Sequence, residues 1–122
     1  MTRRIFLWFW LPVLLYTSLI FLLSGMSNPP IPGGLSGDAL HYPEYAVLAL
    51  LLARALQAGR PGAARPADLL WAVVLSLLFG ATDEVHQAFI PDRVPDLRDW
   101  LHDGIGACAG AFSWAIWRWI RR

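Results

Sequence analysis

The stretch "LLWAVVLSLLFGATDEVHQAFI", Leu69 to Ile90, decides how this chain folds. Its first part is almost wholly apolar, and at 22 residues the stretch can cross about 30 Å of hydrocarbon as a helix. Its last part carries Asp83, Glu84, His86 and Gln87. Because charged groups resist burial unless they are paired or hydrogen-bonded, this polar end is predicted to join other helices in one site.

Composition places the whole chain among membrane proteins. Of its 122 residues, 57% are hydrophobic and the mean hydropathy is +0.46, whereas soluble domains are about 45–50% apolar. All ten basic residues are arginine and the net charge is only +1, so no broad basic face for nucleic acid is expected. Cys108 is the only cysteine, which excludes an intrachain disulfide, and we expect it to pack inside a helix.

Four stretches are long and apolar enough to span a bilayer, at about residues 5–23, 40–57, 69–90 and 100–120. The loops between them are rich in proline and glycine, which end helices. We therefore predict an all-α fold in which residues 1–122 form one domain, an integral membrane four-helix bundle embedded in the lipid bilayer.

Arginines predict the orientation of this bundle. Eight of the ten lie at the termini or around the middle loop, and only Arg93 and Arg98 lie in the third loop. Because arginine and lysine are enriched on the cytoplasmic side, both termini and the middle loop are predicted to be cytoplasmic.

Polar residues of three helices meet at the opposite, outer end in this topology. His41 and Glu44 open the second helix, Asp99 and Asp103 open the fourth, and Asp83 stands near the end of the third. At 1.5 Å per residue, Asp83 would lie about 10 Å from the end of a helix that continues to Ile90. We expect such a site to be half buried.

Helical angles predict how these residues face their neighbours. On the third helix Glu84 and His86 flank one stripe, which consists of Ser76, Gly80, Asp83 and Gln87. On the fourth helix, Gly106 and Gly110 form a Gly-x-x-x-Gly motif that lets another backbone approach closely.

The sequence resembles the VanZ-like family of small bacterial membrane proteins, named for a protein associated with low-level teicoplanin resistance. The resemblance rests on "SGMS" (24–27), "HYPEYAVL" (41–48), "DEVHQAFIPDR" (83–93) and "DWLHDGIGACAG" (99–110). Asp103 departs from the pattern, because the family often has asparagine there. The resemblance implies a multi-pass protein of the bacterial cytoplasmic membrane with a link to glycopeptide susceptibility. It implies neither a reaction nor a ligand, and no cofactor is expected.

Our leading interpretation is an outward-facing pocket that binds a lipid-linked envelope precursor or a lipoglycopeptide. Arg93 would hold an anionic group. Glu84 and His86 would bind polar groups or, if the protein is an enzyme, exchange a proton as acid and base. This interpretation assigns no metal ligand and leaves open whether any reaction is catalysed.

Several alternatives stay open. The polar cluster could serve helix packing alone, or the protein could be an adaptor for other envelope proteins. A helix-bundle metal site could use the i, i+3 pairs His41–Glu44, Asp83–His86 and Asp99–His102. A proton-coupled transporter or channel is a further option. The cytoplasmic half of the spans shows no complete path of ionisable groups, although a homo-oligomer could build one.

Overall fold

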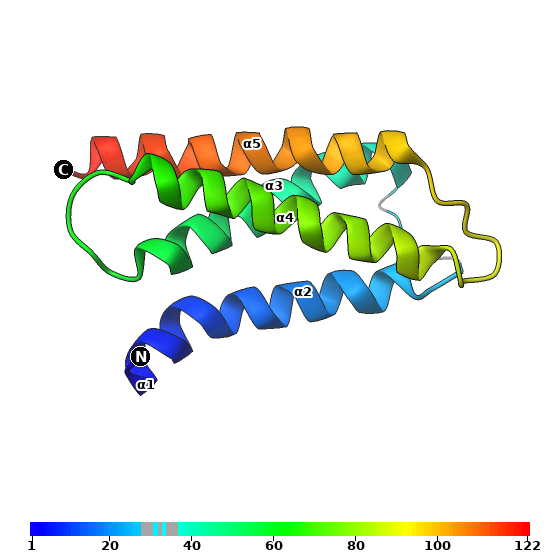
Figure 1. Ribbon diagram of the computed structural model, residues 1–122, viewed down its shortest axis with the longest axis horizontal. Coiled ribbons are helices and arrows are strands. Elements are labelled where there is room, and N and C mark those ends of the chain that lie inside the picture. Colours follow the sequence, from blue (N-terminus) through cyan, green and yellow to red (C-terminus); the bar gives the residue numbers. More distant parts are fainter. Residues whose placement is uncertain (28–30, 32, 34–36) are drawn as a thin grey trace.

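A computed structural model describes residues 1–27, 31, 33 and 37–122, and all regular elements within these ranges are helices. The first helical stretch has three parts, α1 (Arg3–Ile5), the π-helical η1 (Phe6–Trp10) and α2 (Leu11–Ser24). It is followed by α3 (Gly37–Gln57), α4 (Pro66–Gln87) and α5 (Leu97–Ile120) (Figure 1). The all-α prediction is confirmed. In the loop expected between the first two spans, residues 28–30, 32 and 34–36 lie outside the described residues.

The long helices run in alternating directions. Both termini and the α3–α4 loop lie at one end, and the α4–α5 loop lies at the other (Figure 1). We call the first the arginine end, because it holds the chain's arginines other than Arg93 and Arg98. The other is the carboxylate end, defined by His41, Glu44, Asp83, Glu84, Asp99 and Asp103.

Two helical stretches, Arg3–Ser24 and Pro66–Gln87, are long and apolar enough to cross a membrane. Helices α3 and α5 have comparable lengths of 21 and 24 residues. They also carry most of the charged residues of the carboxylate end, which makes them less apolar. Length and composition therefore support two of the four predicted spans.

Helix α4 ends three residues earlier than the predicted span, at Gln87 and not at Ile90. The N–H groups of Phe89 and Ile90 bond to carbonyls three residues back, which tightens the chain into a turn. Pro91 follows, and the residue before a proline disfavours helical geometry. Asp83 consequently lies about one turn, or about 6 Å, from the helix end, closer than the sequence predicted.

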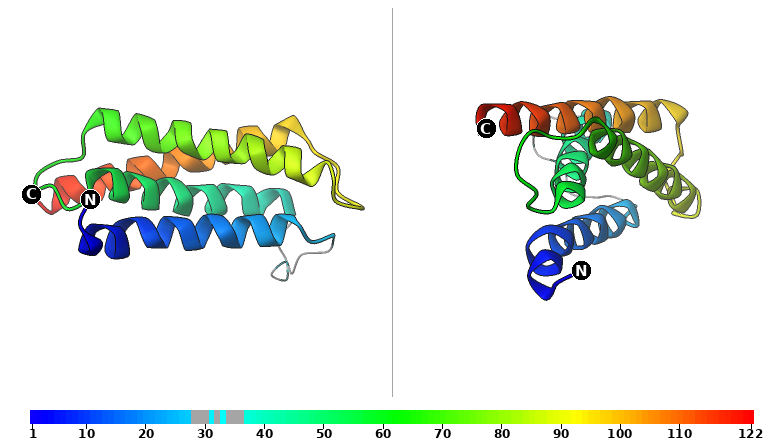
Figure 2. Two further views of the ribbon diagram at one scale, coloured as in Figure 1. Left: turned by 60° about the horizontal axis from the view of Figure 1, so that its bottom comes forward. Right: turned by 60° about the vertical axis from the view of Figure 1, so that its left-hand side comes forward.

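Helix α3 is the centre of the bundle, with α5, α4 and α2 arranged around it (Figure 2). It supplies most of the buried core, including Tyr45, Leu48 and Ala53, none of which is exposed. Helix α2 packs on α3 and α4 only, and many of its apolar side chains face outward. Such an apolar exterior is typical of helices that contact lipid.

Helix α5 approaches α3 closely through the predicted glycine motif. A Cβ at Gly106 would overlap the carbonyl group of Tyr42, and one at Gly110 would overlap that of Ala46. The two glycines therefore allow the backbones to touch, as expected of small-residue seams. This close approach sets the distance between the polar groups that α3 and α5 carry at the carboxylate end.

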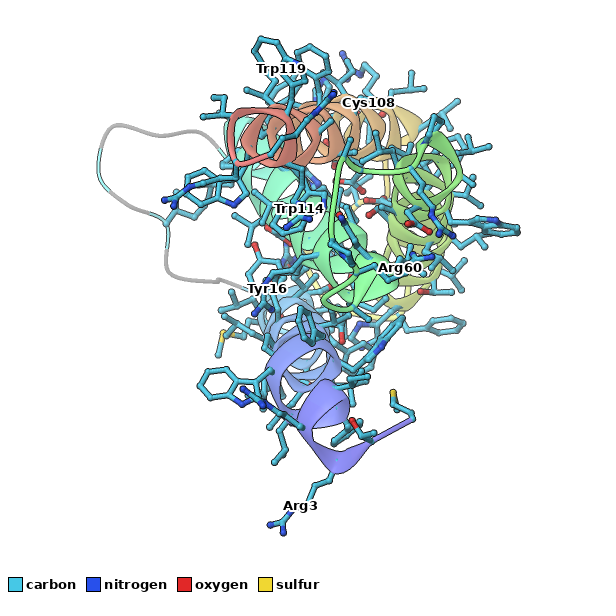
Figure 3. The ribbon with its side chains drawn as sticks, turned by 90° about the vertical axis from the view of Figure 1, so that its left-hand side faces the viewer. Arg3, Tyr16, Arg60, Cys108, Trp114 and Trp119 are labelled. Atoms are coloured by element: carbon cyan, nitrogen blue, oxygen red, sulfur yellow. The ribbon has the colours of Figure 1, made fainter. Side chains whose placement is uncertain are left out.

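Hydrogen bonds hold the arginine end together. Trp114 points into the bundle (Figure 3), where its indole N–H donates to Gln57 Oε1 at 2.9 Å. Arg60 pairs with Asp68 at 2.6 Å, and Arg118 donates to carbonyls of the α3–α4 loop. Cys108 lies within helix α5, as predicted, but its side chain is exposed, so the prediction that it is a packing residue was wrong.

Candidate functional site

The buried face of α4 is the polar stripe that helical angles predicted. Its buried residues are Ala72, Ser76, Gly80, Asp83 and Gln87. Asp83 is only 3% exposed although it carries a carboxylate. The stripe therefore turns its polar atoms toward the other helices and away from the surroundings of the bundle.

His41 on α3 is held by two carboxylates of α5. Its Nδ1 lies 2.6 Å from Oδ1 of Asp103, and its Nε2 lies 3.8 Å from Oδ2 of Asp99. Because a carboxylate only accepts, Nδ1 is the nitrogen that donates to Asp103. The His41 ring is thereby fixed, with Nε2 directed to the side where Asp99 lies.

Glu84 reaches the same place from α4. One of its oxygens accepts the backbone N–H of Asp96 at 3.2 Å, which ties the Glu84 side chain to the start of α5. Ligand atoms of Glu84, His41 and Asp99 all lie within 4.8 Å of one another. Three helices therefore each contribute one polar side chain to a single point.

Asp96 also starts α5. Its side chain accepts from the backbone N–H of Arg98 at 2.9 Å, which is a helix N-cap. This backbone hydrogen bond, together with the hydrogen bonds from the Arg98 guanidinium, holds the pKa of Asp96 below its ordinary value. The cap fixes the turn whose N–H group positions Glu84.

A pocket of about 420 Å³ opens beside Glu84. It is lined by Ala81, Glu84, Pro95, Asp96, Leu97 and Trp100. The indole N–H of Trp100 donates to the Leu77 carbonyl at 2.9 Å, so the ring is fixed along the pocket wall. The pocket thus combines an apolar wall with two carboxylates, Asp96 and Glu84, of which Glu84 also belongs to the His41 group.

Two further carboxylates lie behind this group. Glu44 interacts electrostatically with His41, Asp83 and Asp103. The carboxylate end therefore gathers five acidic side chains around one histidine. Such a concentration of carboxylates favours a cation or a ligand rich in hydrogen-bond donors.

His86 and Arg93 face a different helix, α2. The His86 ring stacks on Phe21 with centroids 4.1 Å apart. Arg93 donates to the carbonyls of Met26 at 2.8 Å and Leu23 at 3.1 Å, and so satisfies the C-terminal end of α2. Among the described contacts, no hydrogen bond joins His86 to Glu84. The histidine that contacts carboxylates is His41, which lies against Asp103 and Asp99.

Buried polar atoms without a hydrogen-bond partner gather at the carboxylate end. They are Ser24 Oγ, Tyr45 Oη, Asp83 Oδ1, Glu84 Oε1, His86 Nδ1, His102 Nδ1 and Asp103 Oδ2. Within the described residues, none of these buried unpartnered side-chain atoms lies at the arginine end. Native proteins rarely leave buried polar atoms unpaired, so this end of the bundle is suited to bind a ligand or an ion.

The nine predicted site residues thus divide into three groups. His41, Glu84, Asp99 and Asp103 come together, with Glu44 and Asp83 close behind them. His86 and Arg93 contact α2, and Gln87 is buried on the α4 stripe.

Sequence reasoning missed Trp100 and the role of Asp96 beside Glu84. Asp96 lies directly before α5 and Trp100 lies near its start. This position beside the predicted polar residues of α5 was the signal that could have identified them.

The chain is an all-α bundle in which two helices are long and apolar enough to cross a membrane, and its ionisable side chains gather at one end. The family model described as VanZ/LLP1 matches residues 5–118, and the chain therefore belongs to this family. The resemblance read from the four motifs is confirmed. Neither a curated protein nor a solved structure matches the chain significantly.

Proposed function

We propose that this protein crosses the bacterial cytoplasmic membrane four times, with both termini in the cytoplasm, and binds an amphiphilic envelope ligand at the carboxylate end. One observation carries the proposal, the contrast between the two ends of the bundle. Polar side chains of the arginine end form hydrogen bonds with one another, as at Arg60–Asp68 and Gln57–Trp114. Those of the carboxylate end leave buried atoms without a hydrogen-bond partner, among them Tyr45 Oη, Glu84 Oε1 and Asp103 Oδ2.

This contrast favours binding over a purely structural cluster. A network that only fixes helix packing gains stability when its members satisfy each other, and unpaired buried groups cost about 1–3 kcal/mol each. The arginine end shows that this chain builds satisfied networks where packing is the purpose. Unpaired groups at the other end are consistent with an external partner that completes them.

The pocket beside Glu84 indicates the class of ligand. Its wall of Ala81, Pro95 and Leu97 suits an acyl or other apolar group, and Trp100 offers a flat amphipathic surface. The carboxylates suit a head group that donates hydrogen bonds through amine, amide or hydroxyl groups. Teicoplanin, the drug with which the family is associated, is a lipoglycopeptide. It combines an acyl group with a head group that donates hydrogen bonds.

A lipid-linked precursor is the second candidate ligand. Its phosphate groups are anionic, and the cation expected to hold them, Arg93, already donates from Nε and one terminal nitrogen to α2 carbonyls. Direct binding of phosphate among five carboxylates is unfavourable. This ligand therefore fits the acidic pocket less well unless a cation bridges the two.

The proposal is tested by teicoplanin susceptibility in a susceptible Gram-positive host that expresses the wild type or a variant. Glu84→Gln removes the charge next to the pocket with almost no change in volume. Asp68→Asn is the matched control, because it removes a carboxylate from the opposite end of the same helix.

Membrane abundance is measured for every strain by immunoblotting. We expect Glu84→Gln to lose resistance at unchanged abundance, while Asp68→Asn keeps it. Wild-type resistance in the Glu84→Gln strain, or no resistance conferred by the wild type, contradicts the proposal.

A further inference from the structure

We infer that His41, Glu84 and Asp99 bind one divalent cation, with Zn²⁺ favoured. The three side chains come from α3, α4 and α5, and their ligand atoms lie within 4.8 Å of one another. In a tetrahedral zinc site with bonds of about 2.1 Å, ligand atoms are about 3.4 Å apart. His41 Nε2 and Asp99 Oδ2 are already 3.8 Å apart, so small side-chain rotations close the site.

The hydrogen bond to His41 is the second observation. Histidine ligands of metals almost always donate their other ring N–H to a carboxylate or carbonyl, which fixes the tautomer and increases the basicity of the ligand nitrogen. Asp103 accepts from Nδ1 of His41 at 2.6 Å, and its side chain is 1% exposed. This arrangement leaves the lone pair of Nε2 directed to the side of Asp99.

Glu84 is positioned in the same manner. It accepts the N–H of Asp96 at 3.2 Å, and its Oε1 is buried without a partner. Metal-binding carboxylates are themselves commonly hydrogen-bonded by surrounding groups. Both His41 and Glu84 are therefore oriented by a neighbour before any ion binds.

Two side chains with buried, unpartnered polar atoms lie beside Gly80. Oδ2 of Asp103 has no partner and would stand 2.9 Å from a Cβ at Gly80, one turn before Glu84 on α4. The Tyr45 ring packs against the same glycine, and its hydroxyl is also unpartnered. An unpartnered, buried oxygen therefore belongs to Asp103, the same residue that accepts the hydrogen bond from His41.

The ligand set selects the type of ion. A divalent cation offsets the repulsion among five neighbouring carboxylates. Carboxylates alone suit Mg²⁺ or Ca²⁺, whereas an imidazole nitrogen shifts the preference toward Zn²⁺. The described residues supply three protein ligands, so a coordination position stays open, as in catalytic zinc sites. Glu84 also lines the pocket, and the open position therefore lies near it.

The site differs from the one that sequence spacing suggested. Each i, i+3 pair would place two ligands on one helix, whereas the structure takes a single residue from each of three helices. Glu44 and His102, which the pairs included, are outside the group. His102 is therefore the position that distinguishes the two arrangements.

Metal binding to the purified full-length protein tests the inference without any envelope ligand. The protein in detergent is stripped with EDTA, exposed to Zn²⁺ or Mg²⁺ and desalted, and the bound metal is measured by mass spectrometry. We expect one Zn²⁺ per chain in the wild type and no stoichiometric zinc in His41→Gln, Glu84→Gln or Asp99→Asn. The controls His102→Gln and Asp92→Asn should retain it.

Asp103→Leu tests the group that orients His41. Loss of such a partner is expected to weaken zinc binding by about 10- to 100-fold, with one ion still bound at saturation. Equal affinity in this variant and the wild type argues against the proposed orientation.

Wild-type protein that retains no zinc overturns the inference, as does undiminished zinc in the three ligand variants. Should those variants fail to fold, the Co²⁺-loaded wild type decides the question. An intense visible absorption band of low-coordinate cobalt supports the site, and a weak spectrum like that of aqueous cobalt overturns it. Because no drug is present, this result is independent of the susceptibility test.

Discussion

Replacement of Gly110 by alanine should separate α3 and α5, two of the three helices that carry the carboxylate end. A Cβ at this position would lie 2.7 Å from the carbonyl carbon of Ala46 and overlap its oxygen, whereas ordinary contact begins at 3.4 Å. Backbone cannot rotate aside as a side chain can, so α3 and α5 must move apart by about 1 Å. Overpacking of this kind costs about 1–3 kcal/mol, and the rigid partner favours the upper half of that range.

Gly104→Ala is the matched control on the same helix. Its Cβ would meet Leu77 Cδ2 at 3.0 Å, which is the far end of a flexible side chain. Both substitutions gain the same helix propensity, about 1 kcal/mol, so their difference isolates the overlap with α3.

Unfolding in detergent micelles, followed by circular dichroism during titration with sodium dodecyl sulfate, measures this difference. We expect Gly110→Ala to be about 2–3 kcal/mol less stable than Gly104→Ala. Equal stability of the two variants would refute the close backbone approach.

Three further predictions concern side chains that form hydrogen bonds. Arg93→Ala removes the guanidinium hydrogen bonds to the carbonyls of Leu23, in the last turn of α2, and Met26, just after it. It should lower the free energy of unfolding by about 1.5–3 kcal/mol in the same titration, and an unchanged value would contradict this role. Gln57→Leu leaves the indole N–H of Trp114 unpaired and should cost about 1–3 kcal/mol and shift the tryptophan emission, whereas unaltered emission would argue against the bond. Asp96→Ala removes the α5 cap. The pKa of Asp96 in the folded protein lies below its ordinary 3.8, so the wild type should have a higher Tm than the variant at neutral pH. This Tm difference should vanish as the pH falls through the lowered pKa. A Tm difference that persists in acid would show that the charge of Asp96 is not what caps α5.

The polar face of α4 could be predicted because it depends on one helix alone. Each residue turns an α-helix by about 100 degrees, which places one stripe of residues on the same face whatever surrounds the helix. The stripe consists of Ser76, Gly80, Asp83 and Gln87, and all four are buried. The glycine motif of α5 was equally accessible, since small residues one turn apart admit a neighbouring backbone. In both cases local geometry decides the outcome.

The partner of each polar side chain could not be predicted in this way. Arg93 stands in a turn after α4, and the sequence indicated an anion-binding role. The structure directs two of its nitrogens to carbonyls of α2, which are close only because α2 and α4 end at the same level. The path of a loop and the end of a helix depend on the packing of distant segments.

By itself the sequence determined the class of protein, its helices and the end at which its ionisable groups gather. Hydropathy, helix breakers and angular spacing are local properties, and they are sufficient for those conclusions. Only the tertiary structure decided that His41 meets Asp103 and Asp99, and that Glu84 joins them in place of Glu44 or His86. The physical reason is that these contacts depend on the rotation and separation of three helices, which the seam between α3 and α5 fixes at Gly106 and Gly110.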